Sequence, residues 1–294
     1  METYEQIFEK YKAAFETALA DYLSKVSFRP DVLNESFRYS LQIGGKRLRP
    51  VLMFACARML GGKEQDVAPF AVALELIHTY SLVHDDLPGM DNDDFRRGQP
   101  SNHKKFGEGQ AILAGDALLN EAYALCFQES RRGRTYLNAA EQICLNAGAR
   151  GMIAGQAADL YYQGNASAGK TEADFIVRNK TGKMIVSAVT VPAYVYGMDE
   201  NIVSLLAEYG KNLGYLFQIT DDMLDVNGDF EKLGKSVGKD ERENKLSYVR
   251  LYGMEECRSL AGYYCGLCEK VLDQLPFETG FLADTARFVL NREY

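Results

Sequence analysis

The sequence predicts an all-α protein that forms a single domain over residues 1–294, with roughly ten helices. Only seven prolines occur in the chain, so the intervals 101–191 and 193–275 can form long uninterrupted helices. Apolar residues recur at the spacing of one helix face, whereas the alternating pattern of strands is scarce. No linker, low-complexity segment or fixed-period repeat divides the sequence, which favours one domain.

Apolar periodicity and turn residues place the first core helices. Residues 52–60 carry apolar side chains at helical spacing and stop at a glycine pair, residues 61–62. Residues 63–87 keep a helical period until the Pro-Gly pair at residues 88–89 ends it. One face of this second helix mixes apolar with polar side chains, so we expect this helix to contribute polar residues as well as core packing.

Capping residues mark two further helix starts. Residues 171–174 resemble a capping box that opens a helix. Asp199 is the expected cap of a helix whose apolar face includes residues 202–209.

Charge and hydropathy exclude several classes of protein. The chain has 33 basic and 41 acidic side chains, a net charge of −8, and no basic run, which argues against nucleic-acid binding. The longest uncharged stretch, residues 184–198, contains Pro192 and is shorter than the roughly 18–20 residues of a membrane span. The first five residues are polar and acidic, unlike a signal peptide. We therefore expect a cytoplasmic protein without a membrane span.

The six cysteines do not predict a disulfide framework, because they are spread over a long chain without a secretory signal. Cys265 and Cys268 form a C-x-x-C spacing, but a zinc site needs two more ligands and the three histidines lie far away in sequence. The same spacing also suits one apolar helix face, which is the interpretation we favour.

Two acidic clusters are the most informative feature of the sequence. The first contains Asp85, Asp86 and Asp91, and the second contains Asp221, Asp222 and Asp225. In the second, the outer aspartates are four residues apart on one helix face, where their charges repel unless a cation bridges them. In the first, a spacing of six puts the outer aspartates on different faces, so residues 88–89 must break the helix and fold Asp91 back. Oxygen ligands alone suit Mg²⁺ that also binds water and substrate phosphates.

Cations accompany both clusters, which favours a diphosphate site over the alternative of a solvated acidic surface. They are Lys46, Arg47 and Arg49 after a glycine pair, Arg96 and Arg97 after the first cluster, Lys180, and Lys235 and Lys245 after the second. The glycine pair permits close backbone approach, while Lys46 and Arg49 are spaced to share a helix face, as a metal-free phosphate site requires. His78 lies two helical turns before Asp85 on nearly the same face, so a structural and a functional role are both open.

These motifs together resemble the trans-isoprenyl diphosphate synthase family, and within it the bacterial-type farnesyl diphosphate synthases. The resemblance spans nearly the whole chain and is carried by residues 44–50, 78–86, 91–98, 113–119, 155–159, 180–182, 217–222 and 233–245. Two departures are mild: Phe95 stands where leucine is usual, and residues 245–249 differ from the usual loop. The resemblance implies the isoprenoid synthase fold, a helical bundle around a central apolar cavity.

The resemblance implies a Mg²⁺-dependent head-to-tail prenyltransferase and a homodimer. An allylic diphosphate ionises, isopentenyl diphosphate attacks the carbocation, and a proton is lost. The implied substrates are isopentenyl diphosphate with dimethylallyl and geranyl diphosphate, and the product is (2E,6E)-farnesyl diphosphate. Four alternatives are weighed: a geranylgeranyl diphosphate synthase, a catalytically silent regulatory subunit of a heteromeric prenyl synthase, a metal-dependent phosphohydrolase, and a terpene cyclase. A terpene cyclase has no use for the second, basic diphosphate site. The silent subunit is disfavoured because both acidic clusters are whole, and the phosphohydrolase because histidines and strands are few.

The resemblance also implies a role for each site residue. About three Mg²⁺ ions bind between Asp85, Asp86 and Asp91 on one side and Asp221, Asp222 and Asp225 on the other. The allylic diphosphate is held by Arg96, Lys180 and Lys235, and Lys245 also contacts substrate. Isopentenyl diphosphate takes the metal-free site of Gly45, Lys46, Arg49, His78 and Arg97. Gln218 and the Thr181 carbonyl face the carbocation, and Lys180, Thr181, Gln218 and Lys235 are the implied catalytic residues.

Product length is expected to depend on Tyr80. This residue is five positions before Asp85, about 7.5 Å deeper along the helix. In the resembled family an aromatic residue here, combined with the Pro-Gly insertion at residues 88–89, goes with farnesyl diphosphate, whereas a small residue or methionine goes with C20 products. The alternative is that Tyr80 only packs in the core, in which case Ser81 or Leu113 is the next candidate.

Overall fold

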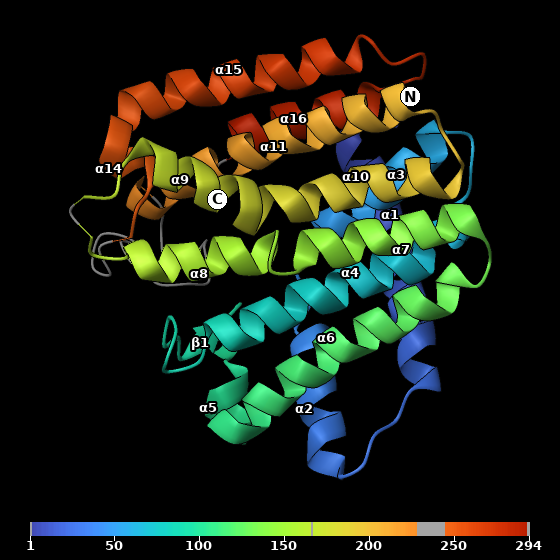
Figure 1. The fold of residues 1–294 in the computed structure, drawn as a ribbon, viewed down its shortest axis with the longest axis vertical. Helices are drawn as coiled ribbons and strands as arrows, with labels where there is room; N and C mark the ends of the chain where they lie inside the picture. Colours follow the sequence, from blue (N-terminus) through green and yellow to red (C-terminus); the bar gives the residue numbers. More distant parts are fainter. Residues whose placement is uncertain (1, 166, 228–244, 293–294) are drawn as a thin grey trace.

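The computed structural model describes residues 2–165, 167–227 and 245–292 and is helical almost throughout (Figure 1). The helices are α1 (Tyr4–Lys25), α2 (Asp31–Gln42), α3 (Leu48–Met59), α4 (Glu64–Asp85), α5 (Asn102–Phe106), α6 (Glu108–Ser130), α7 (Arg134–Ala147), α8 (Met152–Tyr162), α9 (Lys170–Ile176), the π-helix η1 (Val177–Gly182), α10 (Lys183–Val195), α11 (Glu200–Asn227), α14 (Tyr248–Tyr252), α15 (Met254–Leu272) and α16 (Gly280–Asn291). Within these described residues, eleven α-helices have eleven residues or more. The predicted all-α bundle of roughly ten helices is confirmed.

Helix α4 lies at the centre of the bundle. It packs against α1, α3, α6 and α10, and buries twelve of its side chains. By length and composition this helix could cross a membrane, but two-thirds of its most apolar window (67%) is buried inside the fold, as in the core helix of a globular domain. A second group of helices forms around α11, which packs against α10, η1 and α15.

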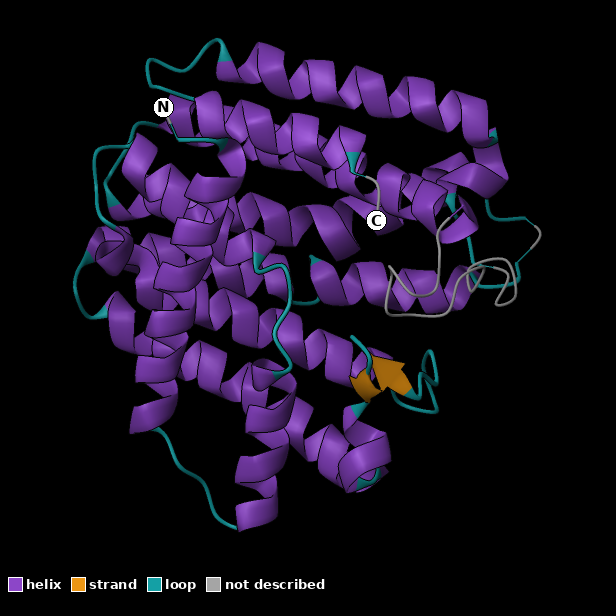
Figure 2. Cartoon of the chain, turned by 180° about the vertical axis from the view of Figure 1, so that it is seen from behind, coloured by secondary structure: helices purple, strands orange, loops and turns teal. Residues whose placement is uncertain are grey.

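The end of α4 has the break that the sequence predicted. The helix stops at Asp85, and the chain turns back so that the Asp91 amide donates to the Asp85 carbonyl at 2.8 Å. A two-residue hairpin then follows, with β1 (Phe95–Arg96) antiparallel to β2 (Gln99–Pro100) at one end of the bundle (Figure 2). The turn brings the last aspartate of the first cluster back beside the first.

Of the two predicted helix caps, the one at Asp199 is confirmed and the one at residues 171–174 lies at a different residue. Asp199 caps α11, since its side chain accepts from the Ile202 amide at 2.9 Å. Helix α9 instead begins at Lys170, and its capping interaction joins the Gly169 amide to the Glu172 carboxylate at 2.9 Å. The capping box predicted at residues 171–174 therefore lies two residues too late, because the N-cap is Gly169 and Glu172 is the third residue of the helix.

Cys265 and Cys268 lie on the buried face of α15. Both thiols are almost inaccessible to solvent, and neither forms a disulfide in the described structure. Their spacing therefore reflects helix packing, as the sequence indicated.

Candidate active site

One cavity of about 210 Å³ brings together most of the residues singled out from the separate motifs. Its lining comes from α4 and the following turn, β1, α8, α9, η1, α11 and the segment before α14: Leu82, Asp85, Asp91, Arg96, Asp159, Ile176, Val177, Lys180, Thr181, Gln218, Asp221, Asp222, Asp225, Lys245, Leu246 and Ser247. Five of the six predicted aspartates thus share one cavity with four predicted cationic or amide side chains.

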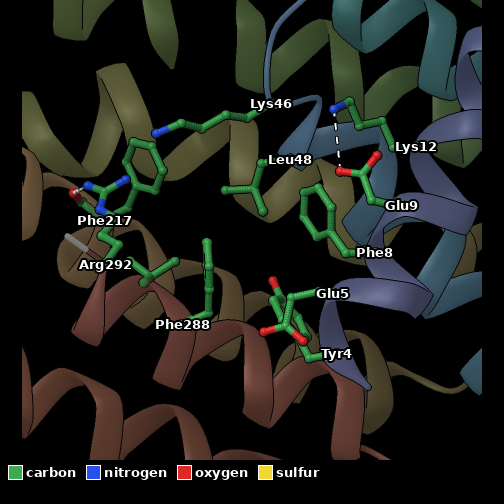
Figure 3. Close-up of a pocket in the computed structure, with 11 residues that line it drawn as sticks. Tyr4, Glu5, Phe8, Glu9, Lys12, Lys46, Leu48, Phe217, Phe288 and Arg292 are labelled. Carbon is green, nitrogen blue, oxygen red and sulfur yellow. Dashed lines mark hydrogen bonds and ion pairs between the residues drawn. The ribbon is translucent and has the colours of Figure 1, made fainter. Parts of the chain in front are cut away.

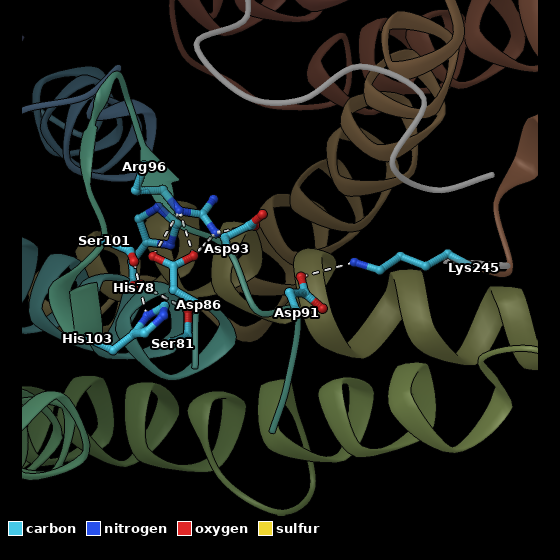
Figure 4. Close-up of polar contacts among 9 residues, drawn as sticks. All are labelled: His78, Ser81, Asp86, Asp91, Asp93, Arg96, Ser101, His103 and Lys245. Atoms are coloured by element: carbon cyan, nitrogen blue, oxygen red, sulfur yellow. Dashed lines mark hydrogen bonds and ion pairs between the residues drawn. The ribbon is translucent and has the colours of Figure 1, made fainter. Parts of the chain in front are cut away.

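The first acidic cluster is divided between the cavity and its wall. Burial raises the pKa of Asp85 to about 6, and the charge of Asp91 adds to this rise while Lys180 opposes it. Asp91 forms an ion pair with Lys245 at 3.0 Å (Figure 4). Asp86 does not line the cavity: it is buried and accepts from the Arg96 Nε at 3.0 Å. The prediction that Asp86 faces metal together with Asp85 is not met by this geometry.

The second cluster is organised by hydrogen bonds around Asp222. One of its carboxylate oxygens accepts from the Gln218 Nε2 at 2.8 Å, and the other accepts from the Tyr248 amide at 2.6 Å. Gln218 in turn accepts from the Thr181 hydroxyl at 2.9 Å. This chain of hydrogen bonds fixes the orientation of the Gln218 amide and joins η1, α11 and the start of α14.

Arg292 is a site residue that sequence reasoning did not find. Its buried guanidinium forms an ion pair with Asp221, lies 4.2 Å from the centroid of the Phe217 ring, and donates to the Thr220 hydroxyl at 2.8 Å. It follows α16 near the end of the chain and belongs to no recognised motif, so only the folded chain shows its place.

A π-helical turn positions Lys180 and Thr181. Such turns inside helices are frequent at functional sites. Lys180 forms an ion pair with Asp159 of α8 at 2.6 Å, a partner that was within a recognised motif but had no predicted role. Gly155 makes the close packing of these two helices possible, because a Cβ atom there would lie 2.2 Å from the backbone nitrogen of Lys180. Lys180 is thereby held at the cavity wall by the close packing of α8 against η1.

A basic group lies beside this cavity. The Arg97 guanidinium covers Gly45 so closely that a Cβ at Gly45 would be 2.5 Å from it. Burial lowers the pKa of His78 well below its usual value, and the charges of Arg49 and Arg97 lower it further. Within the described part of the chain, the buried Nε of Arg49 has no hydrogen-bond partner. Two buried guanidinium groups, an open backbone at Gly45 and a neutral imidazole therefore form a site suited to an anion.

Lys46 does not share a helix face with Arg49, so that prediction was wrong. Helix α3 begins only at Leu48, which leaves Lys46 in the preceding loop. Lys46 instead lines an adjoining, largely apolar cavity of about 250 Å³ with Phe217 and Arg292 (Figure 3). The residue between them, Arg47, is buried in a structural ion pair with Glu75.

Tyr80 lies in the core one turn before the first cluster. Its ring meets the His84 ring edge-on, with ring centroids 5.6 Å apart. Burial raises the pKa of the Tyr80 hydroxyl, and the charge of Tyr123 raises it further. The Ser81 hydroxyl is engaged with the His78 carbonyl at 2.8 Å. Neither Tyr80 nor Ser81 lines the 210 Å³ cavity, and Lys235 falls outside the residues that the structure describes.

The donor set fits Mg²⁺ that is shared with a substrate. Over residues 2–165, 167–227 and 245–292, no three acidic, histidine or cysteine side chains converge closely enough to hold a metal ion by themselves. The aspartates of the cavity offer only oxygen atoms, which suit Mg²⁺ that retains water and phosphate ligands. Asp85 and Asp91 would hold such ions from one side, and Asp221 and Asp225 from the other.

Comparison with known proteins identifies the family. A model of the polyprenyl synthetase family matches residues 30–262. The chain is 40% identical to a farnesyl diphosphate synthase of Geobacillus stearothermophilus over 99% of this chain and 98% of that protein. It is 42% identical to a chloroplastic geranylgeranyl pyrophosphate synthase of Capsicum annuum, over 79% of this chain and 63% of that protein. The chain therefore belongs to the polyprenyl synthetase family.

A solved structure supports the same assignment. A geranyltransferase of Helicobacter pylori, complexed with magnesium and isoprenyl diphosphate, matches with a TM-score of 0.84 and 30% identity, and the match covers 99% of this chain and 98% of that one. The similarity thus extends over the whole fold as well as the sequence.

Proposed function

We propose that this protein is a Mg²⁺-dependent prenyltransferase that condenses isopentenyl diphosphate with dimethylallyl and then geranyl diphosphate to give (2E,6E)-farnesyl diphosphate. One observation carries the proposal: aspartates of two acidic clusters, at the end of α4 and on α11, line one cavity that is also lined by Lys180, Lys245 and Arg96. The relative with the widest coverage among those described above is a farnesyl diphosphate synthase, which supports a C15 product.

The aspartates and cations of the cavity would bind the allylic diphosphate. Mg²⁺, in about three ions, would neutralise the departing diphosphate when bound by Asp85, Asp91, Asp221 and Asp225. Lys180, Arg96 and Lys235 would hold the same diphosphate, with Lys245 beside Asp91. We assign Asp86 and Asp222 to positioning, because Asp86 orients Arg96 and Asp222 orients Gln218.

The second diphosphate would occupy the basic group of Gly45, Arg49, His78 and Arg97, with Lys46 at its outer edge. The buried, unpartnered Arg49 nitrogen supports an anion at this place. Two diphosphates of similar shape would thus be sorted by charge, one by metal and the other by guanidinium groups.

The developing carbocation needs dipoles and no water. Thr181 and Gln218 line the cavity on η1 and α11 and are hydrogen-bonded to each other, so their positions are fixed before substrate binds. Leu82, Ile176 and Val177 add apolar wall at the same cavity, which limits quenching by water.

The proposal is tested by incubating the purified protein with Mg²⁺, isopentenyl diphosphate and each allylic primer, followed by chromatography of the products. We expect mainly C15 product from dimethylallyl and geranyl diphosphate. A main product of C20 would favour the alternative of a geranylgeranyl diphosphate synthase, which the Capsicum annuum relative supports. No turnover with any primer would instead favour the silent regulatory subunit.

We further propose that the chain is a single domain, acts in the cytoplasm and forms a homodimer. Five large apolar side chains on the neighbouring helices α6 and α7 are more than 40% exposed: Ile112, Leu113, Phe127, Leu137 and Leu145. Exposed apolar side chains of this size on adjacent helices are typical of a subunit interface. Light scattering should give about twice the chain mass of 32.9 kDa, and a mass near 33 kDa at micromolar concentration would exclude a stable dimer.

A further inference from the structure

A second groove lies on the other face of the π-helical turn that carries Lys180. It has a volume of about 830 Å³ and lies between the α7–α8 turn, η1, α10 and α11. Lys180 and Thr181 of η1 face the catalytic cavity, whereas Arg178 and Gly182 of the same six residues line this groove. The groove is therefore separate from the candidate active site, although both use one short segment.

The lining of this groove combines basic side chains with small residues. Four cations reach it from three segments: Arg150 from the α7–α8 turn, Arg178 and Lys183 from the continuous η1–α10 helix, and Lys211 from α11. Ala154, Gly182 and Ala207 also line the groove, so little side-chain volume separates an incoming group from the backbone. Cations that converge from separate segments form a site, unlike charges that follow one solvated helix face.

The charge of the groove is not balanced by the protein. Within the described residues, none of these four cations forms an ion pair or hydrogen bond. Exposed cations elsewhere often have such a partner, for example Lys25 with Asp21 and Arg287 with Glu269. Glu208 is the single acidic residue among those that line the groove, which leaves three positive charges in excess. This excess stands out in a chain of net charge −8.

We propose that the groove is a second diphosphate-binding site, outside the catalytic cavity. Two adjacent phosphate groups spread their charge over a length that a single phosphate lacks, and so match four cations that line the groove from separate segments. The Phe175 ring also lines the groove, is 38% exposed and lies 5.9 Å from the Arg178 guanidinium. The ligand is therefore either inorganic diphosphate or an organic diphosphate whose planar part stacks on this ring.

The test compares a groove variant with a control of equal charge change. The groove variant is Arg178→Ser with Lys211→Ser, and the control is Arg134→Ser with Arg258→Ser, two exposed cations outside the groove. Inorganic diphosphate is titrated into each protein by calorimetry, in low salt with EDTA so that no Mg²⁺ can bind diphosphate at the aspartates. We expect one binding equivalent per chain to weaken at least tenfold in the groove variant only. Identical isotherms for the groove variant and the wild type would overturn the proposal.

Two further measurements separate the possible outcomes. ADP in place of inorganic diphosphate identifies the source: tighter binding of ADP that Phe175→Ala removes indicates an organic diphosphate, and equal binding indicates the diphosphate alone. Prenyl transfer is measured in parallel, and we expect the groove variant to retain the wild-type rate because its two residues do not line the catalytic cavity. If the wild type binds diphosphate in the groove but makes no prenyl product, the proposed function is contradicted and the proposal of a second diphosphate site still holds.

Discussion

Helices α4 and α11 each carry one acidic cluster, but they present it in different ways. Helix α4 ends at its cluster, and the turn back to Asp91 completes it. Helix α11 continues through its cluster, so Asp221 and Asp225 are adjacent on one regular face. A continuous helix suits a spacing of four, whereas a spacing of six requires the helix to stop.

The second aspartate of each pair shows what the two regions share. Asp86 and Asp222 are both almost fully buried, and both accept hydrogen bonds from side chains next to the cavity. Asp222 lines the cavity together with Asp85 and Asp221, whereas Asp86 lies outside its lining. In each Asp-Asp pair the second aspartate thus orients a neighbouring side chain, Arg96 for Asp86 and Gln218 for Asp222.

The largest expected effect separates activity from stability at Asp85 and Asp221. Asp85→Ala and Asp221→Ala should each lower turnover by at least about 10³-fold, because each removes charge that holds the leaving diphosphate. Their stabilities should differ. Asp85→Ala removes a buried carboxylate that repels Asp91, so the free energy of unfolding stays equal or rises. Asp221→Ala removes the carboxylate that pairs with the buried Arg292 guanidinium and should cost about 3 kcal/mol.

Steady-state kinetics with Mg²⁺ and urea unfolding of the metal-free protein measure both quantities. Asp91→Ala should lose activity in the same way as Asp85→Ala. The control is Asp273→Ala, because Asp273 is exposed and does not line the cavity. Wild-type turnover in the Asp85 or Asp221 variant would show that this residue does not hold the metal. Equal unfolding free energies would show that Arg292 does not depend on Asp221.

The second prediction tests the positioning role of Asp86 and Asp222. Asp86→Ala leaves the Arg96 guanidinium without its main partner, and Asp222→Ala leaves two donors, the Gln218 amide and the Tyr248 backbone, without acceptors. Each variant should unfold with about 2 kcal/mol less free energy. Asp86→Asn and Asp222→Asn keep an acceptor and should recover most of this loss in urea unfolding. Turnover in Asp86→Asn and Asp222→Asn should exceed that of Asp85→Asn by at least tenfold. An equal loss of turnover in all three variants would indicate that Asp86 and Asp222 are metal ligands as well.

The third prediction concerns the interior of α4. Tyr80→Ala opens a space beneath Asp85, next to His84 and Tyr123, into which a longer chain can extend. Products should shift from C15 to C20 or longer, while the first condensation continues. Tyr80→Phe keeps the ring and is the matched control. An unchanged C15 profile in Tyr80→Ala would place the limit of the cavity at Ser81 or on α6.

The contrast between the two helices also explains what the sequence could predict. Periodicity and the Pro-Gly pair were sufficient to predict the end of α4 and the return of Asp91, because both follow from local backbone chemistry. The ion pair of Arg292 with Asp221 joins residues 71 positions apart. The place of Lys46 depended on the residue at which α3 begins, which sequence periodicity determines least well. Orientation was likewise hidden: two adjacent aspartates have the same pattern whether a side chain faces the cavity or its wall.

The last prediction concerns the pH dependence that α4 imposes through His78. Burial and the charges of Arg49 and Arg97 keep this side chain neutral in the folded protein, whereas in the unfolded chain it gains a proton below about pH 6.5. The unfolded state then binds more protons, so the free energy of unfolding falls as the pH falls, by up to about 1.4 kcal/mol per pH unit. Asp85 acts in the opposite direction in the same range, because its raised pKa of about 6 lets the folded state gain a proton first.

The stability of the wild type alone therefore shows only the sum of the His78 and Asp85 effects. The contribution of His78 is obtained by comparing the wild type with His78→Asn. Relative to the wild type, this variant should gain about 1 kcal/mol between pH 6.5 and pH 5.5 in urea unfolding, and no change above pH 7.5. A difference between the two proteins that stays constant from pH 7.5 to pH 5.5 would show that His78 is protonated equally in both states and that the basic group does not hold it neutral.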